Sequence, residues 1–166
     1  YNLPEYLNSG DLLIFNDTRV MKARLHGIRI PSGSKIEILL LQRLEEGLWK
    51  VLVKPGRRMR TGDIFEIQKL DQIISGKIVK EYPDGSRLVK LSDESLLESL
   101  GSIPLPPYIK TGTNDPERYQ TVYSKVTGSI AAPTAGLHFT PKLIEDIKNK
   151  GIELAFTTLH VGWDSF

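Results

Sequence analysis

KIEILLLQRLEEGLWKVLVK, residues 35–54, contains two β-rich runs and decides the architecture of the central part of the chain. Residues 35–43 and 48–54 are dominated by apolar and β-branched side chains, and residues 44–47 (LEEG) interrupt them. Two such runs joined by a short polar, glycine-containing loop predict a β-hairpin. The hairpin indicates that this part of the chain is built from antiparallel strands.

Further strands are predicted on the carboxyl side of this hairpin. A Thr-Gly-Asp turn precedes a strand over residues 64–68. Strands over residues 73–81 and 87–91 flank residues 82–86 (YPDGS), whose proline, aspartate and glycine each favour a turn. Many short strands at close spacing are typical of a small β-barrel.

Both ends of the chain have a different character. Residues 11–17 (DLLIFND) form a continuous apolar run that ends in turn residues, which predicts a buried strand. Ser92 is expected to cap a helix over residues 93–100, and Thr140 to cap a helix over residues 141–150 that has proline at its first position. Residues 152–161 are predicted to form a strand. Strand, loop, helix and strand in this order favour an α/β arrangement.

An alternating pattern over residues 20–30 predicts one further strand, which is expected to begin the barrel. We therefore expect an α+β, multidomain fold. In it, an α/β domain made of residues 1–19 and 93–166 carries an inserted β-barrel-like domain of residues 20–92.

Composition excludes several classes of protein. Of the 166 residues, 40% are hydrophobic and 25% are charged, values that exclude a disordered chain. No apolar run reaches the length that a membrane-spanning helix needs. The absence of cysteine excludes a disulfide, a thiolate nucleophile and a cysteine-zinc site, and it fits a reducing compartment. A net charge of +2 is too small to predict nucleic-acid binding by itself, so any RNA contact requires a local basic patch.

Three polar segments are candidates for binding. Residues 16–19 (NDTR) follow the first predicted strand, where α/β folds place ligand-binding groups, although the same residues also form simple turns. Residues 54–60 (KPGRRMR) hold four cations that suit phosphate groups, and a solvated loop is the alternative. Residues 118–123 (RYQTVY) combine tyrosines and glutamine, which stack on and read unpaired bases; tyrosines that cover a core are the alternative.

A fourth segment, residues 129–141 (SIAAPTAGLHFTP), is rich in small residues and leads into a predicted helix. Small residues let the main chain approach a ligand, and a helix start offers free N–H groups to anions; a tightly packed connection is the alternative. His138 lies in this segment, and His160 lies near the end of the last predicted strand. Together with His26, the histidines lack the spacing of a metal site.

Taken in order, the motifs resemble one family closely. They are DLLIFNDTRVMKARLHG, LVKPGRRMRTGD, PLPPYI, ERYQTVYSK, GSIAAPTAGLHFTPKLIEDIKNKGI and TLHVG, and they extend over nearly the whole chain. This pattern resembles the S-adenosylmethionine:tRNA ribosyltransferase-isomerase family of queuosine biosynthesis. Two departures, a short spacing between Leu3-Pro4 and Gly10 and an ending in WDSF after HVG, indicate an incomplete chain of about half the enzyme.

The resemblance implies a transferase and isomerase that acts in tRNA modification. The ribosyl moiety of S-adenosyl-L-methionine is moved to 7-aminomethyl-7-deazaguanine in tRNA and rearranged to give epoxyqueuosine, and adenine and methionine are released. S-adenosylmethionine is then a co-substrate, with no true cofactor and no metal. The resemblance further implies a monomeric, cytoplasmic protein that does not bind a membrane.

The resemblance also implies roles for individual residues of this sequence. His138 is the first choice for the catalytic acid or base and His160 the second, although either histidine alternatively only orients a ligand. The substrate and cofactor pocket would be formed by Asn16, Asp17, Arg19, Arg118, Tyr119, Gln120, Tyr123, Pro133, Thr134, Ala135 and Gly136. The tRNA backbone would be bound by Lys54, Arg57, Arg58 and Arg60.

Two alternatives belong to other functional classes. The predicted barrel and its basic segment alone would also suit a non-catalytic RNA-binding β-barrel module. A methyltransferase would use the same sulfonium substrate, but the sequence lacks the glycine-rich strand-to-helix fingerprint of a nucleotide-binding fold.

Overall fold

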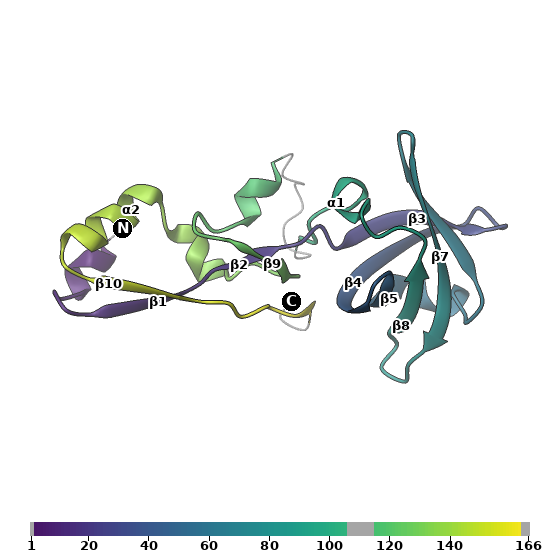
Figure 1. Ribbon diagram of the computed structural model, residues 1–166, viewed down its shortest axis with the longest axis horizontal. Coiled ribbons are helices and arrows are strands. Elements are labelled where there is room, and N and C mark those ends of the chain that lie inside the picture. Colours follow the sequence, from purple (N-terminus) through teal and green to yellow (C-terminus); the bar gives the residue numbers. More distant parts are fainter. Residues whose placement is uncertain (1, 106–114, 164–166) are drawn as a thin grey trace. The chain divides into compact units, whose positions relative to one another are not determined.

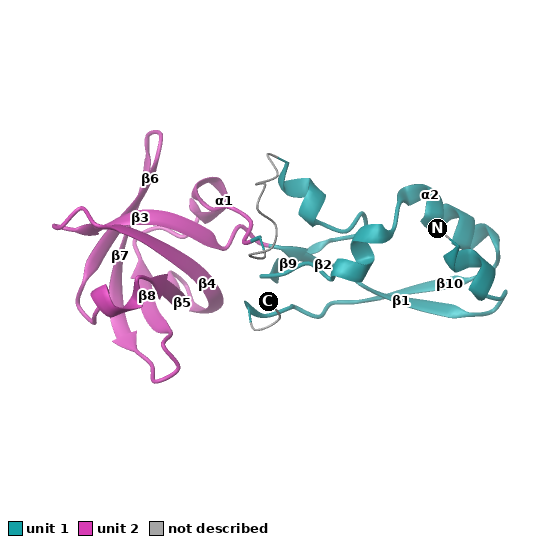
Figure 2. Cartoon of the chain, turned by 180° about the vertical axis from the view of Figure 1, so that it is seen from behind, with its two compact units in different colours: residues 1–20, 105–166 teal, residues 21–104 magenta. Residues whose placement is uncertain are grey.

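The computed structural model describes residues 2–105 and 115–163, and within it the chain divides into two compact units. Unit 1 consists of residues 1–20 and 105–166, and unit 2 consists of residues 21–104 (Figure 2). Unit 2 is therefore an insertion between the two segments of unit 1. The expected division placed residues 93–104 in the outer domain, and the structure corrects this boundary.

Unit 2 is a closed six-stranded barrel (Figure 1). Its strands are β3 (Arg24–Ile30), β4 (Lys35–Glu45), β5 (Leu48–Lys54), β6 (Ile64–Lys69), β7 (Gln72–Glu81) and β8 (Arg87–Leu91). Neighbouring strands are antiparallel in the order β3-β4-β5-β8-β7-β6, and pairing of β3 with β6 closes the barrel. The predicted barrel and both predicted hairpins are confirmed.

The barrel interior is filled with side chains. Inward-facing residues alternate along each strand, and the largest of those fully buried are Leu25, Ile38, Phe65, Ile67, Ile74 and Ile78. Gly76 makes room for the largest of them, because a Cβ atom at this position would lie 2.1 Å from the Phe65 ring. The barrel is thus a packed core and leaves no channel along its axis for a ligand.

The region that follows the barrel folds onto it. The helix predicted over residues 93–100 is shorter, α1 (Leu97–Leu100), and its two leucines join the barrel core. Ser92 does not cap this helix; its hydroxyl accepts a hydrogen bond from the Ser75 amide at 3.0 Å. Burial of Leu97 and Leu100 explains why residues 93–104 belong to unit 2.

Unit 1 contains two pairs of parallel strands. Strand β1 (Leu12–Asn16) pairs with β10 (Glu153–Thr157), and β2 (Thr18–Val20) pairs with β9 (Val126–Ser129). The strand predicted over residues 20–30 is therefore wrong in its extent: it is split into β2 and β3, because Val20 is bound to β9 whereas Arg24 enters the barrel.

Helix α2 (Pro141–Asn149) confirms the prediction from sequence. The Thr140 hydroxyl accepts a hydrogen bond from the Leu143 amide at 3.1 Å, and Ile147 is fully buried. Short 3-10 helices form at Leu3–Tyr6, Pro116–Tyr119 and Thr134–His138 in unit 1 and at Gly56–Arg58 in unit 2. None of the helices in residues 2–105 and 115–163 is long and apolar enough to cross a membrane.

Candidate functional site

The candidate site lies where the two strand pairs of unit 1 meet. Strand β1, which pairs with β10, ends at Asn16. The chain then continues as β2, which pairs with β9. Because β1 and β10 are parallel, their carboxyl ends lie at the same edge. The strand predicted over residues 152–161 ends early, at Thr157, and residues 158–160 are held by side chains at this edge.

Three consecutive side chains bind the segment that follows β10. The Asn16 side chain donates to the Leu159 carbonyl at 2.8 Å and accepts from the Leu159 amide at 3.0 Å. The buried Asp17 carboxylate accepts a hydrogen bond from the Thr158 hydroxyl at 2.7 Å. Asn16 therefore takes the place of a peptide group in the strand ladder, and both side chains fix the backbone that carries His160.

His160 has one ring nitrogen fixed and an exposed ring. Its Nδ1 lies 2.8 Å from the hydroxyl of Thr18, which is fully buried. The ring packs on the main chain of Gly128, where a Cβ atom would lie only 2.5 Å from Nε2. In the tautomer in which Nδ1–H donates a hydrogen bond to the Thr18 hydroxyl, Nε2 carries no proton and can accept one from a substrate, which is the arrangement that a general base requires.

The loop after His160 is also anchored. The Ser129 hydroxyl, at the end of β9, accepts a hydrogen bond from the Val161 amide at 2.7 Å. The Ile130 amide donates to the Val161 carbonyl at 2.9 Å. His160 is consequently held by residues 16–18, where β1 leads into β2, and through Val161 by Ser129 and Ile130 at the end of β9.

The RYQTVY segment also forms hydrogen bonds with β2. The buried Gln120 side chain accepts from the Val20 amide at 2.9 Å and donates to the Val20 carbonyl at 2.8 Å. Arg19 forms an ion pair with Glu117 and donates to the Ser124 hydroxyl at 3.0 Å. Gln120 thus uses its amide within the protein, so a base edge would have to compete with Val20 for it.

The other polar residues of this segment have different exposures. Tyr119 is buried, whereas Arg118 is exposed to solvent. Tyr123 is half-buried in an aromatic cluster, with its ring centroid 4.8 Å from that of Phe15. Burial raises the pKa of the Tyr123 hydroxyl, and the adjacent Thr121 hydroxyl opposes this effect.

The small-residue segment packs on this aromatic cluster. A Cβ atom at Gly136 would lie 2.3 Å from the Tyr123 hydroxyl, so the main chain of the segment rests directly on that side chain. Thr134 and Ala135 are exposed, and Pro133 is partly exposed. Of the predicted pocket residues, Tyr123 and Gly136 are therefore in contact.

His138 has surroundings that differ from those of His160. It is the exposed last residue of the 3-10 helix Thr134–His138. It lines a cavity of about 320 Å³ together with Leu3, Leu137, Phe139, Thr140 and Leu143. The two histidines thus have different neighbours, and four of the six residues that line this cavity are apolar.

The four basic residues of the predicted tRNA contact belong to unit 2, whereas the predicted pocket residues belong to unit 1. Lys54 ends β5, and Arg57 and Arg58 are exposed on the 3-10 helix Gly56–Arg58. Arg60 is paired with Glu81 at 3.1 Å. The four cations therefore differ in how readily they can bind a phosphate group.

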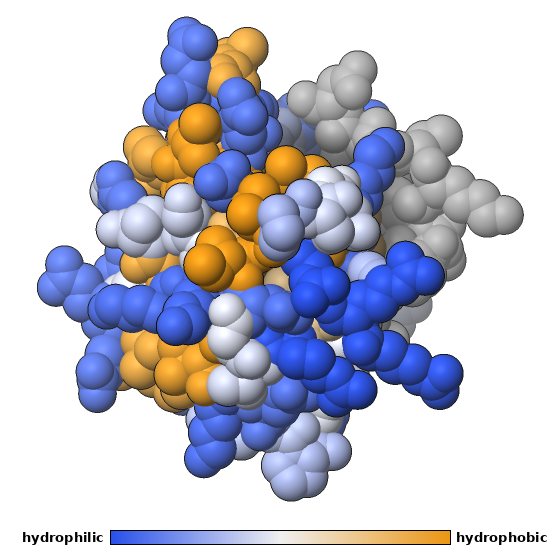
Figure 3. All heavy atoms as spheres, turned by 90° about the vertical axis from the view of Figure 1, so that its right-hand side faces the viewer, coloured by the Kyte–Doolittle hydropathy of each residue, from blue (hydrophilic) through white to orange (hydrophobic). Residues whose placement is uncertain are grey.

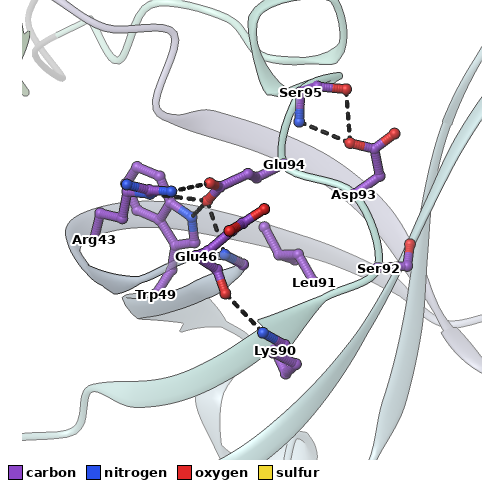
Figure 4. A pocket seen from close by; sticks show the side chains of 10 residues that line it. Arg43, Glu46, Trp49, Lys90, Leu91, Ser92, Asp93, Glu94 and Ser95 are labelled. Atoms are coloured by element: carbon purple, nitrogen blue, oxygen red, sulfur yellow. Dashed lines mark hydrogen bonds and ion pairs between the residues drawn. The ribbon is translucent and has the colours of Figure 1, made fainter.

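One cavity in unit 2 was not found by sequence reasoning. It has a volume of about 750 Å³ and lies where residues 90–95 pass the β4–β5 hairpin (Figure 4). Its centre is the Glu94 carboxylate, which accepts hydrogen bonds from the Trp49 indole at 2.9 Å, from the Gly47 amide at 3.0 Å and from Arg43. These donors, Arg43 above all, lower the pKa of Glu94 to about 2. A carboxylate with this many partners fastens the segment to the barrel.

Within residues 2–105 and 115–163, no group of three or more histidine, cysteine, aspartate or glutamate residues could hold a metal ion. Residues 106–109 of the PLPPYI motif lie outside the described residues.

Comparison with known proteins identifies relatives along the whole chain. The family model described as "Queuosine biosynthesis protein" matches residues 1–166. The S-adenosylmethionine:tRNA ribosyltransferase-isomerase of Finegoldia magna is 52% identical over 170 residues, which cover 100% of this chain and 48% of the relative. The corresponding protein of Clostridioides difficile is 51% identical over 166 residues, which cover 98% and 48%.

A solved structure is also similar. The S-adenosylmethionine tRNA ribosyltransferase of Thermotoga maritima is 34% identical, with a TM-score of 0.43, and the match covers 96% of this chain and 44% of that chain. The chain spans about half the length of the curated relatives it matches. Because the family model matches every residue from 1 to 166, the chain belongs to the family of queuosine biosynthesis proteins.

Proposed function

We propose that this chain is part of an S-adenosylmethionine:tRNA ribosyltransferase-isomerase. Such an enzyme transfers the ribosyl moiety of S-adenosylmethionine to 7-aminomethyl-7-deazaguanine in tRNA and isomerises it. The products are epoxyqueuosine in the tRNA, free adenine and methionine. The observation that carries the proposal is the identity of about 50% with relatives of that name over nearly the whole chain.

S-adenosylmethionine is consumed in this reaction, so it is a co-substrate. The reaction needs a base to remove a proton next to the sulfonium and a group that assists the departure of adenine. Both histidines stay in the proposal. The hydrogen bond with Thr18 and the packing of the ring on the main chain of Gly128 favour His160 as the acid or base. The cavity that His138 lines favours a ligand-orienting role for His138.

The remaining predicted residues receive roles that follow their exposure. Arg118, Thr134 and Ala135 are exposed and are proposed to contact substrate directly. Asn16, Asp17, Arg19, Tyr119, Gln120, Tyr123, Pro133 and Gly136 are proposed to shape the pocket. Lys54, Arg57, Arg58 and Arg60 are proposed to contact tRNA phosphates. We further propose that the enzyme is monomeric and cytoplasmic.

The test is an assay for free adenine with the full-length protein, S-adenosylmethionine and tRNA that carries the modified base. Release of adenine that depends on tRNA supports the proposal. Methylated RNA without adenine would indicate a methyltransferase, and tRNA binding without either product would indicate a binding module. Each of these two results would overturn the proposal.

The role of the histidines is tested with three matched variants. His160→Gln and His138→Gln are compared with His26→Gln, a control on the barrel strand β3, where the imidazole is exposed 3.6 Å from Glu37. Loss of a general base is expected to lower the rate by about 10²–10⁴-fold with tRNA binding retained. If His160→Gln behaves like the His26 control, the role assigned to His160 is wrong.

A further inference from the structure

Two exposed arginines of the barrel, Arg57 and Arg58, lie on the short turn of residues 56–59 that follows β5, called here the arginine turn. Among residues 2–105 and 115–163, neither Arg57 nor Arg58 forms an ion pair. Long hydrophilic side chains project between hydrophobic groups on the face of the molecule that Figure 3 shows. Unpaired guanidinium groups of this kind are available to phosphate oxygens.

Arg87 lies beneath this turn and is almost fully buried. Its guanidinium donates to the carbonyls of Met59 at 3.2 Å and Gly56 at 3.1 Å, which are both in the turn. It also donates to the Gly85 carbonyl, in the hairpin that joins β7 to β8, at 2.5 Å. One side chain therefore ties the arginine turn to the neighbouring hairpin.

Two further cations, Lys50 of β5 and Lys80 of β7, lie beside the aromatic ring of Tyr82 in this hairpin. The ammonium groups of Lys50 and Lys80 lie 5.2 Å and 5.1 Å from the centre of the Tyr82 ring. The cation–π attraction of each ammonium group to the ring opposes the repulsion between the two ammonium groups. Tyr82 thus holds two cations at the hairpin that Arg87 ties to the arginine turn.

Two carboxylates moderate this charge. Glu81 accepts a hydrogen bond from the Thr61 amide and pairs with Arg60 at 3.1 Å and with Arg87 at 3.7 Å. Asp84 pairs with Lys50 at 2.9 Å. Glu81 therefore stabilises the chain at residues 60–61, whereas Asp84 competes with any bound anion for Lys50.

We propose that Lys50, Arg57, Arg58 and Lys80 form a single surface that binds the phosphodiester backbone of RNA, and that Arg87 is the positioning residue that joins its two halves. This basic barrel surface rests on the proposed function, which supplies tRNA as the partner. Lys50, Lys80 and Arg87 extend the contact beyond the arginine turn that the sequence indicated. Among residues 2–105 and 115–163, the contacts of the Arg87 guanidinium are with main-chain carbonyls and Glu81, so its contribution is geometric.

The first experiment measures tRNA affinity of the full-length protein as a function of salt concentration. Arg57→Ala/Arg58→Ala and Lys50→Gln/Lys80→Gln are compared with Lys142→Ala/Lys148→Ala, which removes two exposed cations from α2. Each phosphate contact contributes about 0.9 to the slope of log affinity against log salt, so each test pair is expected to flatten the slope by about 2 relative to the control.

The outcomes separate this inference from the proposed function. If the arginine pair and the lysine pair both match the control, the proposed tRNA contact of the barrel fails altogether. If only the arginine pair flattens the slope, the tRNA contact stands and the single surface proposed here is wrong.

A second measurement uses a change of the opposite sign. Asp84→Asn keeps an acceptor for Ser86 but frees Lys50, so tRNA is expected to bind more tightly. Asp146→Asn, on α2, is the matched control for the loss of one exposed carboxylate. Equal affinities of these two variants would overturn the place of Lys50 in the surface.

The role of Arg87 is tested by coupling. Arg87→Lys keeps the charge but cannot reach carbonyls in both loops, because an ammonium lacks the guanidinium fork. It is expected to weaken tRNA binding in the wild-type background and to have little further effect in the Arg57→Ala/Arg58→Ala background. Purely structural damage would lower the unfolding temperature but would weaken binding equally in both backgrounds, and that result would refute the positioning role.

Discussion

Replacing Gly128 with alanine is expected to displace the His160 ring, although the substitution itself removes no ionisable side chain. The added Cβ atom would lie 2.5 Å from Nε2 and 2.6 Å from Cε1 of the imidazole. Favourable contacts between such atoms begin at about 3.5 Å, so the ring has to move away by about 1 Å. The Thr18 hydroxyl lies 2.8 Å from Nδ1, and a movement of this size breaks that hydrogen bond.

The consequence is measurable in the adenine-release assay. A misplacement of about 1 Å in a catalytic group costs on the order of 10²-fold in rate. Gly128→Ala is therefore expected to slow adenine release by about that factor and to leave tRNA affinity near the wild-type value. Thermal unfolding measured on the same sample reports any general loss of stability.

The double variant Gly128→Ala/His160→Gln separates the two explanations. If Gly128 acts by seating the imidazole, alanine has no further effect once the imidazole is gone. A wild-type rate for Gly128→Ala would refute the reasoning. So would a full additional loss in the double variant, because it would place the effect of Gly128 outside His160.

Three predictions concern the stability of each unit. Glu94→Gln is expected to cost about 1.5–3 kcal/mol at pH 7 in urea unfolding. Since the folded pKa of Glu94 is lowered to about 2 from an ordinary 4.5, this stabilisation is complete above pH 4.5 and is lost as the pH falls toward 2, so the variant should show a flatter acid limb. Gly76→Ala is expected to cost about 1–3 kcal/mol by overlap with Phe65, and Phe65→Leu in the same chain should recover part of it; full stability of Gly76→Ala would show that the barrel relaxes. Gln120→Glu is expected to destabilise unit 1 by about 1–3 kcal/mol because a carboxylate cannot donate to the Val20 carbonyl, and proteolysis kinetics equal to wild type would contradict this.

Local features of the sequence were sufficient to predict the barrel and helix α2. Alternation of apolar residues fixes which side chains of β4, β5 and β7 face inward, and the glycine-containing turns fix where those strands reverse. Thr140 and Pro141 specify where α2 begins through a hydrogen bond and a fixed dihedral angle that involve only neighbouring residues.

The ends of several elements depended on contacts between distant residues. Residues 20–30 alternate like one strand, yet the pairing of Val20 with β9 splits them at the boundary between the units. The helix predicted over residues 93–100 shortens because Glu94 is held by Arg43 and Trp49 of the barrel hairpin. Helix and strand propensities depend on a few neighbouring residues and therefore carry no information about such distant partners.

The candidate site was determined by the sequence only in its residue types. Within residues 16–19, Asn16, Asp17 and Arg19 were predicted as site residues and a simple turn was the alternative, whereas Thr18 was given no role, because the spacing of these residues carries no information about a partner. The partners of Asn16, Asp17 and Thr18 lie 141–143 residues further along the chain, at residues 158–160. The parallel pairing of β1 with β10 brings the two segments to one edge, and only there can the Thr18 hydroxyl meet the imidazole of His160.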